Sequence, residues 1–297
     1  VHMKKVNVLH IDAFSSIPNM GNPAGVVLNG EDYCDEEMQY IAKQIGFNET
    51  AFLLPSKLAD YRIRYFTPGH EMNLCGHATM GTVYAMHQQG LLQKASLTIE
   101  TNAGVLPIEC FSVNNQLSLK MQHAKPQFKK FTGSVEKLAA SIGISVEEID
   151  HTLPIVYGST GTWTLIIPIK KLQSFSKMIP TTGDFPEILV DLPTSSVHPI
   201  CFEVRDADND MHARHFSSPY SGTIEDAVTG TGSGVMGAYY KTFVEPSLHL
   251  PVTLKVEQGH EMNKEGLVYV HVEEIAQEIS ISISGTAVFV KAIELTL

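Results

Sequence analysis

The sequence predicts a mixed α+β protein made of two similar lobes. Its length of 297 residues lies near the size at which one hydrophobic core stops growing and a chain divides. Alternating apolar runs, which are typical of strands, outnumber the segments with helical spacing. Motifs also recur between the two halves. Arg64-Tyr65-Phe66 is matched by Arg214-His215-Phe216, and Cys75-Gly76-His77 by Thr229-Gly230-Thr231, so we infer a duplicated lobe.

The first half has the pattern of a curved sheet around one helix. Met38, Ile41 and Ala42 recur at helical spacing behind an acidic first turn, and Gly46 is the expected end of that helix. A later segment of small residues is the expected central helix. We expect helices at residues 35–46 and 76–90, and strands at residues 5–14, 21–28, 48–54, 61–66, 95–101, 104–110 and 116–122.

The second half repeats this plan. A pair of strands around a glycine turn is expected at 153–169, and a small-residue helix at 230–243. Residues 128–151 carry a helical pattern with polar flanks, and we expect them to connect the lobes. A short helix is expected at 170–178, and strands at 199–204, 211–216, 252–259, 266–272, 279–285 and 286–295.

Two lobes are therefore predicted, an N-terminal one at residues 3–124 and a C-terminal one at residues 125–297. That the last strand joins the N-terminal lobe stays an open alternative. Val1 and His2 precede Met3 and resemble an expression scar, so they are left out of the fold prediction.

Composition narrows the classes of partner. The formal net charge is −11, and no cluster of Lys and Arg offsets it locally, which argues against nucleic acid and anionic membranes. No run of eighteen apolar residues and no signal-like apolar stretch occurs, so we expect a cytoplasmic protein. The 4 cysteines lie far apart without a C-x-x-C pair, which disfavours a zinc site or a disulfide framework.

Four motifs in order carry a family resemblance. The segments GNPAGVV, GFNETAFL, YFTPGHEMNLCGHAT and EDAVTGTG together resemble the PhzF-like phenazine biosynthesis family, within the diaminopimelate epimerase-like superfamily. The resemblance covers the whole chain. It implies that each lobe is a β-barrel-like sheet around a central helix, that the active site lies in the cleft between the lobes, and that the protein is a homodimer.

The expected helices begin at corresponding glycines, Gly76 and Gly230. A helix N-terminus presents unpaired N–H groups and the positive end of a dipole, and glycine lets a ligand approach the backbone. If the lobes face each other, both N-termini suit one small carboxylate and the negative charge that develops when a neighbouring carbon loses its proton. Cys75, Thr229 and Thr231 complete the expected substrate-binding set, and binding is expected to close the cleft.

Three residues are candidates for catalysis. Glu49 matches the family's general acid/base glutamate, whereas from the sequence alone an exposed turn carboxylate is the favoured interpretation. His77 lies in the family's active-site motif, whereas taken alone it is a structural histidine at a helix start. Asp226 is either the cap of the following helix or, by resemblance, a residue that orients His77 or the substrate.

Cys75 keeps alternative reactions open. In the racemase and epimerase branch of the superfamily, paired cysteines act from the two helix starts. Here the second position is Thr229, which cannot act as a thiolate base, so two-base racemisation is disfavoured. Cys75 is then a small buried hydrophobe or the base of a one-base dehydration or epimerisation. A protein of this fold that binds small carboxylates without catalysis is a further alternative, disfavoured because the polar set is complete.

A competing dinucleotide motif is weak. Residues 232–237 fit G-x-G-x-x-G, and Glu257 follows about twenty residues later, as that motif requires. The segment before it is not a buried parallel strand, and the acidic Glu225 and Asp226 would repel a pyrophosphate. We therefore expect no organic cofactor and no metal. The sequence predicts a cofactor-independent isomerase that moves a proton on a small carboxylate-bearing substrate.

Overall fold

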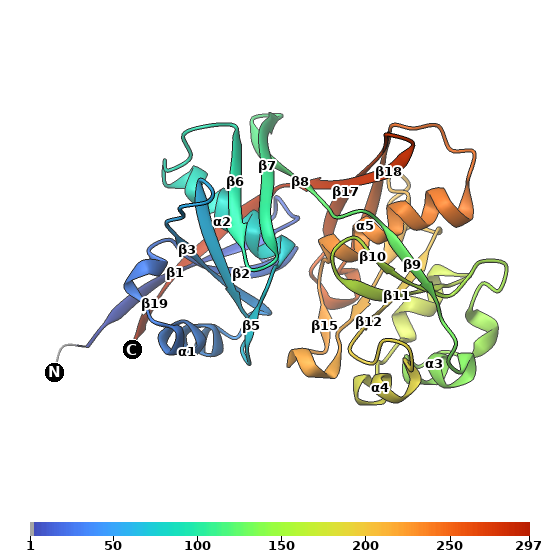
Figure 1. The fold of residues 1–297 in the computed structure, drawn as a ribbon. Helices are drawn as coiled ribbons and strands as arrows, with labels where there is room; N and C mark the ends of the chain where they lie inside the picture. The colour runs from blue at the N-terminus through green and yellow to red at the C-terminus, as the bar shows by residue number, and fades with distance from the viewer. Residues whose placement is uncertain (1–2) are drawn as a thin grey trace. The chain divides into compact units, whose positions relative to one another are not determined.

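The computed structural model describes residues 3–297 and divides them into two compact units (Figure 1). The first unit comprises residues 3–122 and 284–297, and the second comprises residues 123–283. The last strand, β19 (Ala287–Thr296), thus belongs to the first unit. Within residues 3–297, no helix combines the length and the apolar character needed to cross a bilayer.

The first unit is a curved sheet that packs against α2 (Gly76–Gln88), with α1 (Asp35–Ile45) beside it (Figure 1). Strand β1 (Lys5–Ala13) pairs antiparallel with β19 on one side and with β2 (Asn22–Val27) on the other, and β2 pairs in parallel with β3 (Glu49–Leu54). The remaining strands are β4 (Tyr61–Phe66), β5 (Glu71–Met72), β6 (Ser96–Thr101), β7 (Gly104–Val113) and β8 (Gln116–Gln122).

Helix α1 forms where the sequence predicts it. Its apolar stripe buries Met38, Ile41 and Ala42 against the sheet, and this burial holds the helix on the core. The carboxylate of Glu37 accepts the backbone N–H of the N-cap residue, which satisfies one of the unpaired groups at that end. The helix ends at Gly46, whose φ of 76° is the left-handed conformation that favours glycine.

Helix α2 lies against one face of the sheet. Nine of its thirteen residues are buried, so it has no polar stripe of the surface kind. A Cβ atom on its Gly81 would lie 3.5 Å from both the Cβ of Ala24 and the Cβ of Ile11. These two residues are register partners on β2 and β1. Their side chains therefore mark the face of the sheet that α2 covers.

The second unit has the same general plan, with α5 (Gly230–Tyr239) packed against β10 and β17. Nine of the ten residues of α5 are buried, and a π-helical turn at Tyr240–Val244 follows it. The other elements are β9 (Gln127–Lys130), α3 (Val135–Ser141), β10 (Val156–Ser159), β11 (Trp163–Pro168), α4 (Phe185–Ile188), β12 (Ser196–Cys201), β13 (Met211–Ala213), β14 (His215–Phe216), β15 (Glu225–Asp226), β16 (Val252–Gln258), β17 (Gly266–Ile275) and β18 (Glu278–Gly285).

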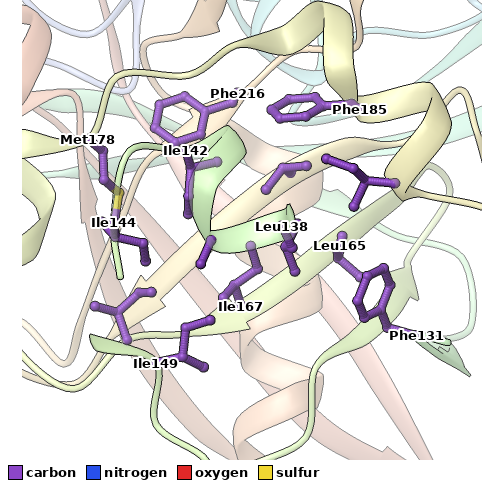
Figure 2. Close-up of a cluster of buried hydrophobic side chains, with 14 of the residues drawn as sticks. Phe131, Leu138, Ile142, Ile144, Ile149, Leu165, Ile167, Met178, Phe185 and Phe216 are labelled. Atoms are coloured by element: carbon purple, nitrogen blue, oxygen red, sulfur yellow. The ribbon is translucent and has the colours of Figure 1, made fainter. Parts of the chain in front are cut away.

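A large apolar cluster stabilises the second unit (Figure 2). Leu138 and Ile142, from α3 and its end, pack in it together with Leu165 and Ile167 of β11. The segment that we expected to connect the lobes is therefore part of this unit. It begins with β9, which pairs with β10, and continues into α3.

Two further local expectations are corrected by the structure. The short helix expected at 170–178 is a 3-10 helix at Leu172–Lys177. The strand expected at 211–216 is broken at Arg214, whose guanidinium turns inward and donates to the carbonyl oxygens of Phe175 and Met178 at 2.7 and 3.0 Å. The α+β class with two similar halves is confirmed.

Candidate active site

The N-terminus of α2 holds two of the predicted residues in contact. Cys75 is the N-cap residue, and His77 is the second residue of the helix, with 5% of its surface exposed. The Sγ atom of Cys75 and the Nδ1 atom of His77 are 3.1 Å apart, within the range of a sulfur hydrogen bond. Gly76 lies between them and begins the helix as expected.

Glu49 lies on the face of the sheet that α2 covers. It is the first residue of β3 and the register partner of Ala24 on the parallel strand β2, so both side chains point to the same face. The side chain of Ala24 contacts α2 at Gly81. Glu49 is 6% exposed, which excludes the interpretation as an exposed turn carboxylate.

Tyr65 connects these groups, and sequence reasoning did not identify it as a site residue. It pairs with Ala51 on β3, two residues after Glu49, and therefore lies on the same face. Thr79 of α2 donates its hydroxyl proton to the carbonyl of Cys75 at 2.8 Å and accepts from the Tyr65 hydroxyl. Burial raises the pKa of Tyr65 well above its usual value, and electrostatic interactions with Cys75 and Glu49 add to this effect.

An arginine–glutamate ion pair joins the two strands that precede each central helix, β4 and β5 before α2 and β14 and β15 before α5. In the first unit, Arg64 binds both carboxylate oxygens of Glu71 at 2.8 and 2.9 Å. Hydrogen bonds to this carboxylate raise the pKa of Arg64, and the guanidinium lowers that of Glu71. In the second unit, Arg214 binds both oxygens of Glu225 at 2.9 and 2.7 Å. The same bidentate arginine–glutamate pair therefore joins the two strands before α2 and before α5.

The N-terminus of α5 carries the second group of predicted residues. Thr229 is its N-cap residue, and Gly230 and Thr231 form its first turn, with Gly230 buried and Thr231 half-buried. The hydroxyl of Thr229 donates to Oδ2 of Asp226 at 2.7 Å. Asp226 thus lies beside the helix start, with its carboxylate held by the N-cap side chain.

A pair of histidines, the buried His198 and the half-buried His215, lies next to the strand that carries Asp226. His215 of β14 is the direct register partner of Asp226 on the antiparallel strand β15, so their side chains share a face. The Nδ1 atoms of His215 and His198 are 2.8 Å apart. One of the two nitrogens must donate and the other accept, so at most one of the two rings is protonated. Burial lowers the pKa of both residues, which agrees with that assignment.

The glycine run at 232–237 does not form a phosphate loop. It lies within α5, where its glycines allow close packing. A Cβ on Gly232 would lie 2.6 Å from the ring of His198, and one on Gly237 would lie 2.4 Å from Val270. Glu257, the acidic residue of the supposed dinucleotide motif, is bound to His212 at 2.6 Å. The structure therefore gives these residues roles in packing and in an internal ion pair.

The structure brings the predicted residues together in two groups. Glu49, Cys75, Gly76 and His77 lie at the α2 end of the first unit. The second unit collects the others around the α5 end: Asp226, Thr229, Gly230 and Thr231. Among residues 3–297, no set of three or more His, Cys, Asp and Glu side chains is arranged to hold a metal ion.

Comparison with known proteins identifies the family. The family model described as phenazine biosynthesis-like protein, PhzC-PhzF, matches residues 11–292. The chain is 50% identical to the Bacillus subtilis "uncharacterized isomerase YfhB", over 97% of each chain. It is 29% identical to the trans-2,3-dihydro-3-hydroxyanthranilate isomerase of Pseudomonas aeruginosa, over 93% of this chain and 94% of that one.

A solved structure agrees with these sequence relationships. The crystal structure of a PhzF-family phenazine biosynthesis protein from Bacillus anthracis is 54% identical in sequence and has a TM-score of 0.96. The match covers 99% of this chain and 100% of that one. The fold predicted from the motifs is therefore confirmed, and the chain is an isomerase that belongs to the phenazine biosynthesis-like PhzC-PhzF family.

Proposed function

We propose that this isomerase moves a proton within a small carboxylate-bearing substrate, without a metal or an organic cofactor. Glu49 is the acid/base in this proposal. It removes a proton from one carbon of the substrate, the double-bond system shifts, and a proton returns at another carbon, so the atoms of substrate and product balance. The supporting observation is a carboxylate that is only 6% exposed and faces the helix whose N-terminus holds Cys75 and His77.

The two helix starts supply the binding groups in the proposal. Backbone N–H groups at Gly76 and Gly230 bind the substrate carboxylate and stabilise the charge that develops beside it. His77 donates a hydrogen bond or a proton, and Asp226 orients an amino or hydroxyl group of the substrate. Thr231 adds a hydroxyl at the second helix start.

The first substrate to test is the one named for the Pseudomonas aeruginosa relative, trans-2,3-dihydro-3-hydroxyanthranilate. It carries a carboxylate and an amino group, which suits the binding groups proposed above. A panel of small cyclic and acyclic carboxylates extends the search. Incubation in deuterated water, followed by NMR or mass spectrometry, detects loss of a carbon-bound proton for any member of the panel.

The central prediction concerns Glu49→Gln. Loss of a positioned base lowers kcat by about 100-fold or more and leaves ligand binding nearly intact, because the amide keeps the size of the side chain. Steady-state kinetics and calorimetric titration of a substrate or product measure the two effects. Glu109→Gln is the matched control, since Glu109 is an exposed carboxylate on β7 of the same unit. Full turnover by Glu49→Gln would remove Glu49 from the chemistry.

A second candidate reaction has one observation in its favour. The 3.1 Å contact between Sγ of Cys75 and Nδ1 of His77 is the geometry in which an imidazole takes a thiol proton. A one-base dehydration or epimerisation in which Cys75 removes the substrate proton would use that contact. Variants of Cys75 separate this candidate from the proton shift that depends on Glu49.

A further inference from the structure

Gln258 is a buried polar residue outside the predicted site. It is the last residue of β16, it is 2% exposed, and it pairs in parallel with Ala213 of β13. A buried side-chain amide costs free energy unless its donors and acceptor are satisfied. The partners of Gln258 are all in the turn that leads into α5.

Three hydrogen bonds join Gln258 to that turn. Its Oε1 accepts the backbone N–H of Thr229 at 3.0 Å. Its Nε2 donates to the backbone carbonyl of Asp226 at 2.9 Å and to the Thr229 hydroxyl at 3.1 Å. The orientation of the amide follows from its partners, because the N–H of Thr229 can only donate and the carbonyl of Asp226 can only accept.

The directions of these bonds continue to the carboxylate of Asp226. The Thr229 hydroxyl accepts from Gln258, so its one proton points to Oδ2 of Asp226, 2.7 Å away. A hydroxyl that accepts from an amide is a better donor, because the bonds of a chain polarise one another. The chain fixes the rotamer of Asp226 and stabilises its negative charge.

The backbone after Gln258 packs against the same turn, residues 226–229. Gly259 has a φ of 94°, a conformation that side chains rarely adopt. A Cβ there would lie 2.9 Å from the carbonyl oxygen of Ala227 and 2.3 Å from that of Lys264. The end of β16 therefore packs directly on the residues between Asp226 and Thr229, and the contact of Gln258 is set by rigid backbone.

From this geometry we infer that Gln258 is a positioning residue, which acts through the Thr229 hydroxyl to hold the Asp226 carboxylate in the orientation in which it binds the substrate. The inference rests on the proposed function, in which Asp226 orients the substrate. It gives Thr229 a role that does not depend on thiol chemistry, namely to pass a hydrogen bond from the scaffold to the carboxylate.

Two substitutions at Gln258 test the inference. Gln258→Leu removes all three hydrogen bonds and lowers kcat by about 10- to 100-fold, because small displacements of a group that orients the substrate are costly, while KM changes less than about threefold. Gln258→Glu keeps the shape and the Oε1 acceptor but replaces the donor by a carboxylate, which competes with Asp226 for the Thr229 proton. We expect Gln258→Glu to be at least as impaired as Gln258→Leu. Wild-type kcat in Gln258→Glu would overturn the inference, since only the shape of the residue would then matter.

A double-mutant cycle tests the path through Thr229. Thr229→Val should lower kcat about as much as Gln258→Leu. The kcat of the double variant should be little lower than that of either single variant, because both substitutions break the same chain of hydrogen bonds. Thr229→Ser keeps the hydroxyl and should restore most of the activity. If the two losses of transition-state stabilisation were additive in the double variant, the inferred path through Thr229 would be overturned. Thr253→Val is the matched control, since it removes an exposed hydrogen bond to His271 elsewhere on β16.

A readout without substrate separates this inference from the proposed function. Gln258→Leu should speed hydrogen exchange of the Thr229 backbone amide, measured by NMR, while Gln258→Glu, which keeps the acceptor, should not. If Glu49→Gln is fully active but the exchange pattern holds, the proposed function fails and the hydrogen-bond chain stands. If exchange at Thr229 is unchanged in a folded Gln258→Leu, the chain itself is refuted.

Discussion

At the scale of single residues, Cys75 decides between the two candidate reactions. Its thiol contacts His77 at 3.1 Å, but the corresponding residue at the other helix start is Thr229. If Glu49 is the base, Cys75→Ala should keep most of the activity, and thiol alkylation should inhibit only by its bulk. Rates before and after alkylation, in the wild type and in Cys75→Ala, measure this.

The opposite outcome has a clear signature. Loss of activity in Cys75→Ser, together with a fully active Glu49→Gln, would assign the proton transfer to the thiol. Cys110→Ala is the matched control, since Cys110 is a half-buried thiol of the same unit whose pKa burial raises to about 11. Cys110 should therefore react slowly with alkylating reagents and leave activity unchanged.

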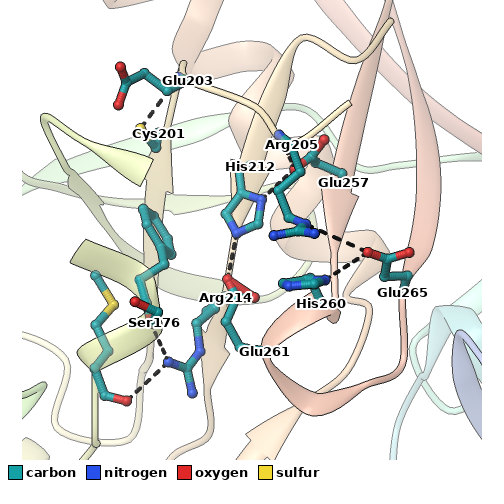
Figure 3. A network of polar contacts seen from close by, with 12 residues as sticks. Ser176, Cys201, Glu203, Arg205, His212, Arg214, Glu257, His260, Glu261 and Glu265 are labelled. Atoms are coloured by element: carbon teal, nitrogen blue, oxygen red, sulfur yellow. Dashed lines mark hydrogen bonds and ion pairs between the residues drawn. The ribbon is translucent and has the colours of Figure 1, made fainter. Parts of the chain in front are cut away.

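A second residue-scale feature is the buried histidine of the second unit (Figure 3). His212, 1% exposed, lies between Glu257 and Glu261, with a ring nitrogen 2.6 Å from a carboxylate oxygen on each side. Burial alone would lower the pKa of His212, but the hydrogen bonds that its ring donates to both glutamates raise it. The imidazolium in turn helps lower the pKa of Glu257 to about 2, against the effect of burial. We therefore infer a charged histidine between two carboxylates.

This cluster makes stability depend on pH with a definite sign. A histidine with a raised pKa stabilises the fold fully below its unfolded value of about 6.5 and less as the pH rises through its folded value. Glu257 contributes above about pH 4.3 and loses that contribution as the pH falls towards 2. His212→Gln should cost roughly 3 kcal/mol, because it leaves two buried carboxylates without their cation.

Urea denaturation from pH 4 to pH 9 tests that prediction. The gap in unfolding free energy between wild type and His212→Gln should be greatest between about pH 4.5 and 6.5 and shrink above neutrality. The control His151→Gln, at an exposed histidine of the same unit, should leave the pH dependence unchanged. A gap that is constant or grows above neutrality would show that His212 is neutral.

At the scale of elements, the sequence pattern predicted the helices and strands whose formation depends on neighbouring residues. The apolar stripe of α1, the starts of α2 and α5 and most strands follow from periodicity and from glycine positions. The two-residue strands β5 and β15 are too short for any period, and Arg214 breaks an alternating run because its side chain turns inward. Strand register also depends on long-range pairing, so the position of Tyr65 beside Glu49 and of Gln258 behind Thr229 could not be predicted.

The glycines of α5 give an element-scale prediction. A Cβ on Gly237 would lie 2.4 Å from Cγ1 of Val270 and 3.2 Å from Cγ2 of Val272, both fully buried on β17. Overpacking costs about 1–3 kcal/mol and more when neighbours cannot move, which outweighs the gain of about 1 kcal/mol from alanine in a helix. Gly237→Ala should therefore lower the melting temperature.

Gly183→Ala is the control for that experiment. Gly183 is exposed in the same unit, and no atom lies within 4 Å of the position its Cβ would take. Its effect should stay within about 0.5 kcal/mol. Calorimetry of both variants gives the comparison, and equal stability of Gly237→Ala and the wild type would mean that the contact between α5 and β17 is looser than the structure indicates.

At the scale of the whole molecule, the two units share a local plan. Each unit has an arginine–glutamate ion pair before a buried helix of small residues, and the residues around the two helix starts differ. Tyr65 in the first copy corresponds to His215 in the second, and Met72 corresponds to Asp226. The two helix starts are therefore similar in backbone and different in the side chains beside them.

The predicted homodimer is also a property of the whole molecule. Each chain of 32.6 kDa carries a formal charge of −11, so two chains repel each other at long range. Salt screens that repulsion, with a Debye length that falls from about 30 Å at 0.01 M to about 8 Å at 0.15 M ionic strength. If apolar contacts hold the dimer, its dissociation constant should fall as salt is added.

Light scattering and sedimentation at micromolar concentration, in low and in physiological salt, measure the mass. A single 32.6 kDa species under all conditions would exclude the dimer, and dissociation on adding salt would show that ion pairs rather than apolar contacts hold it.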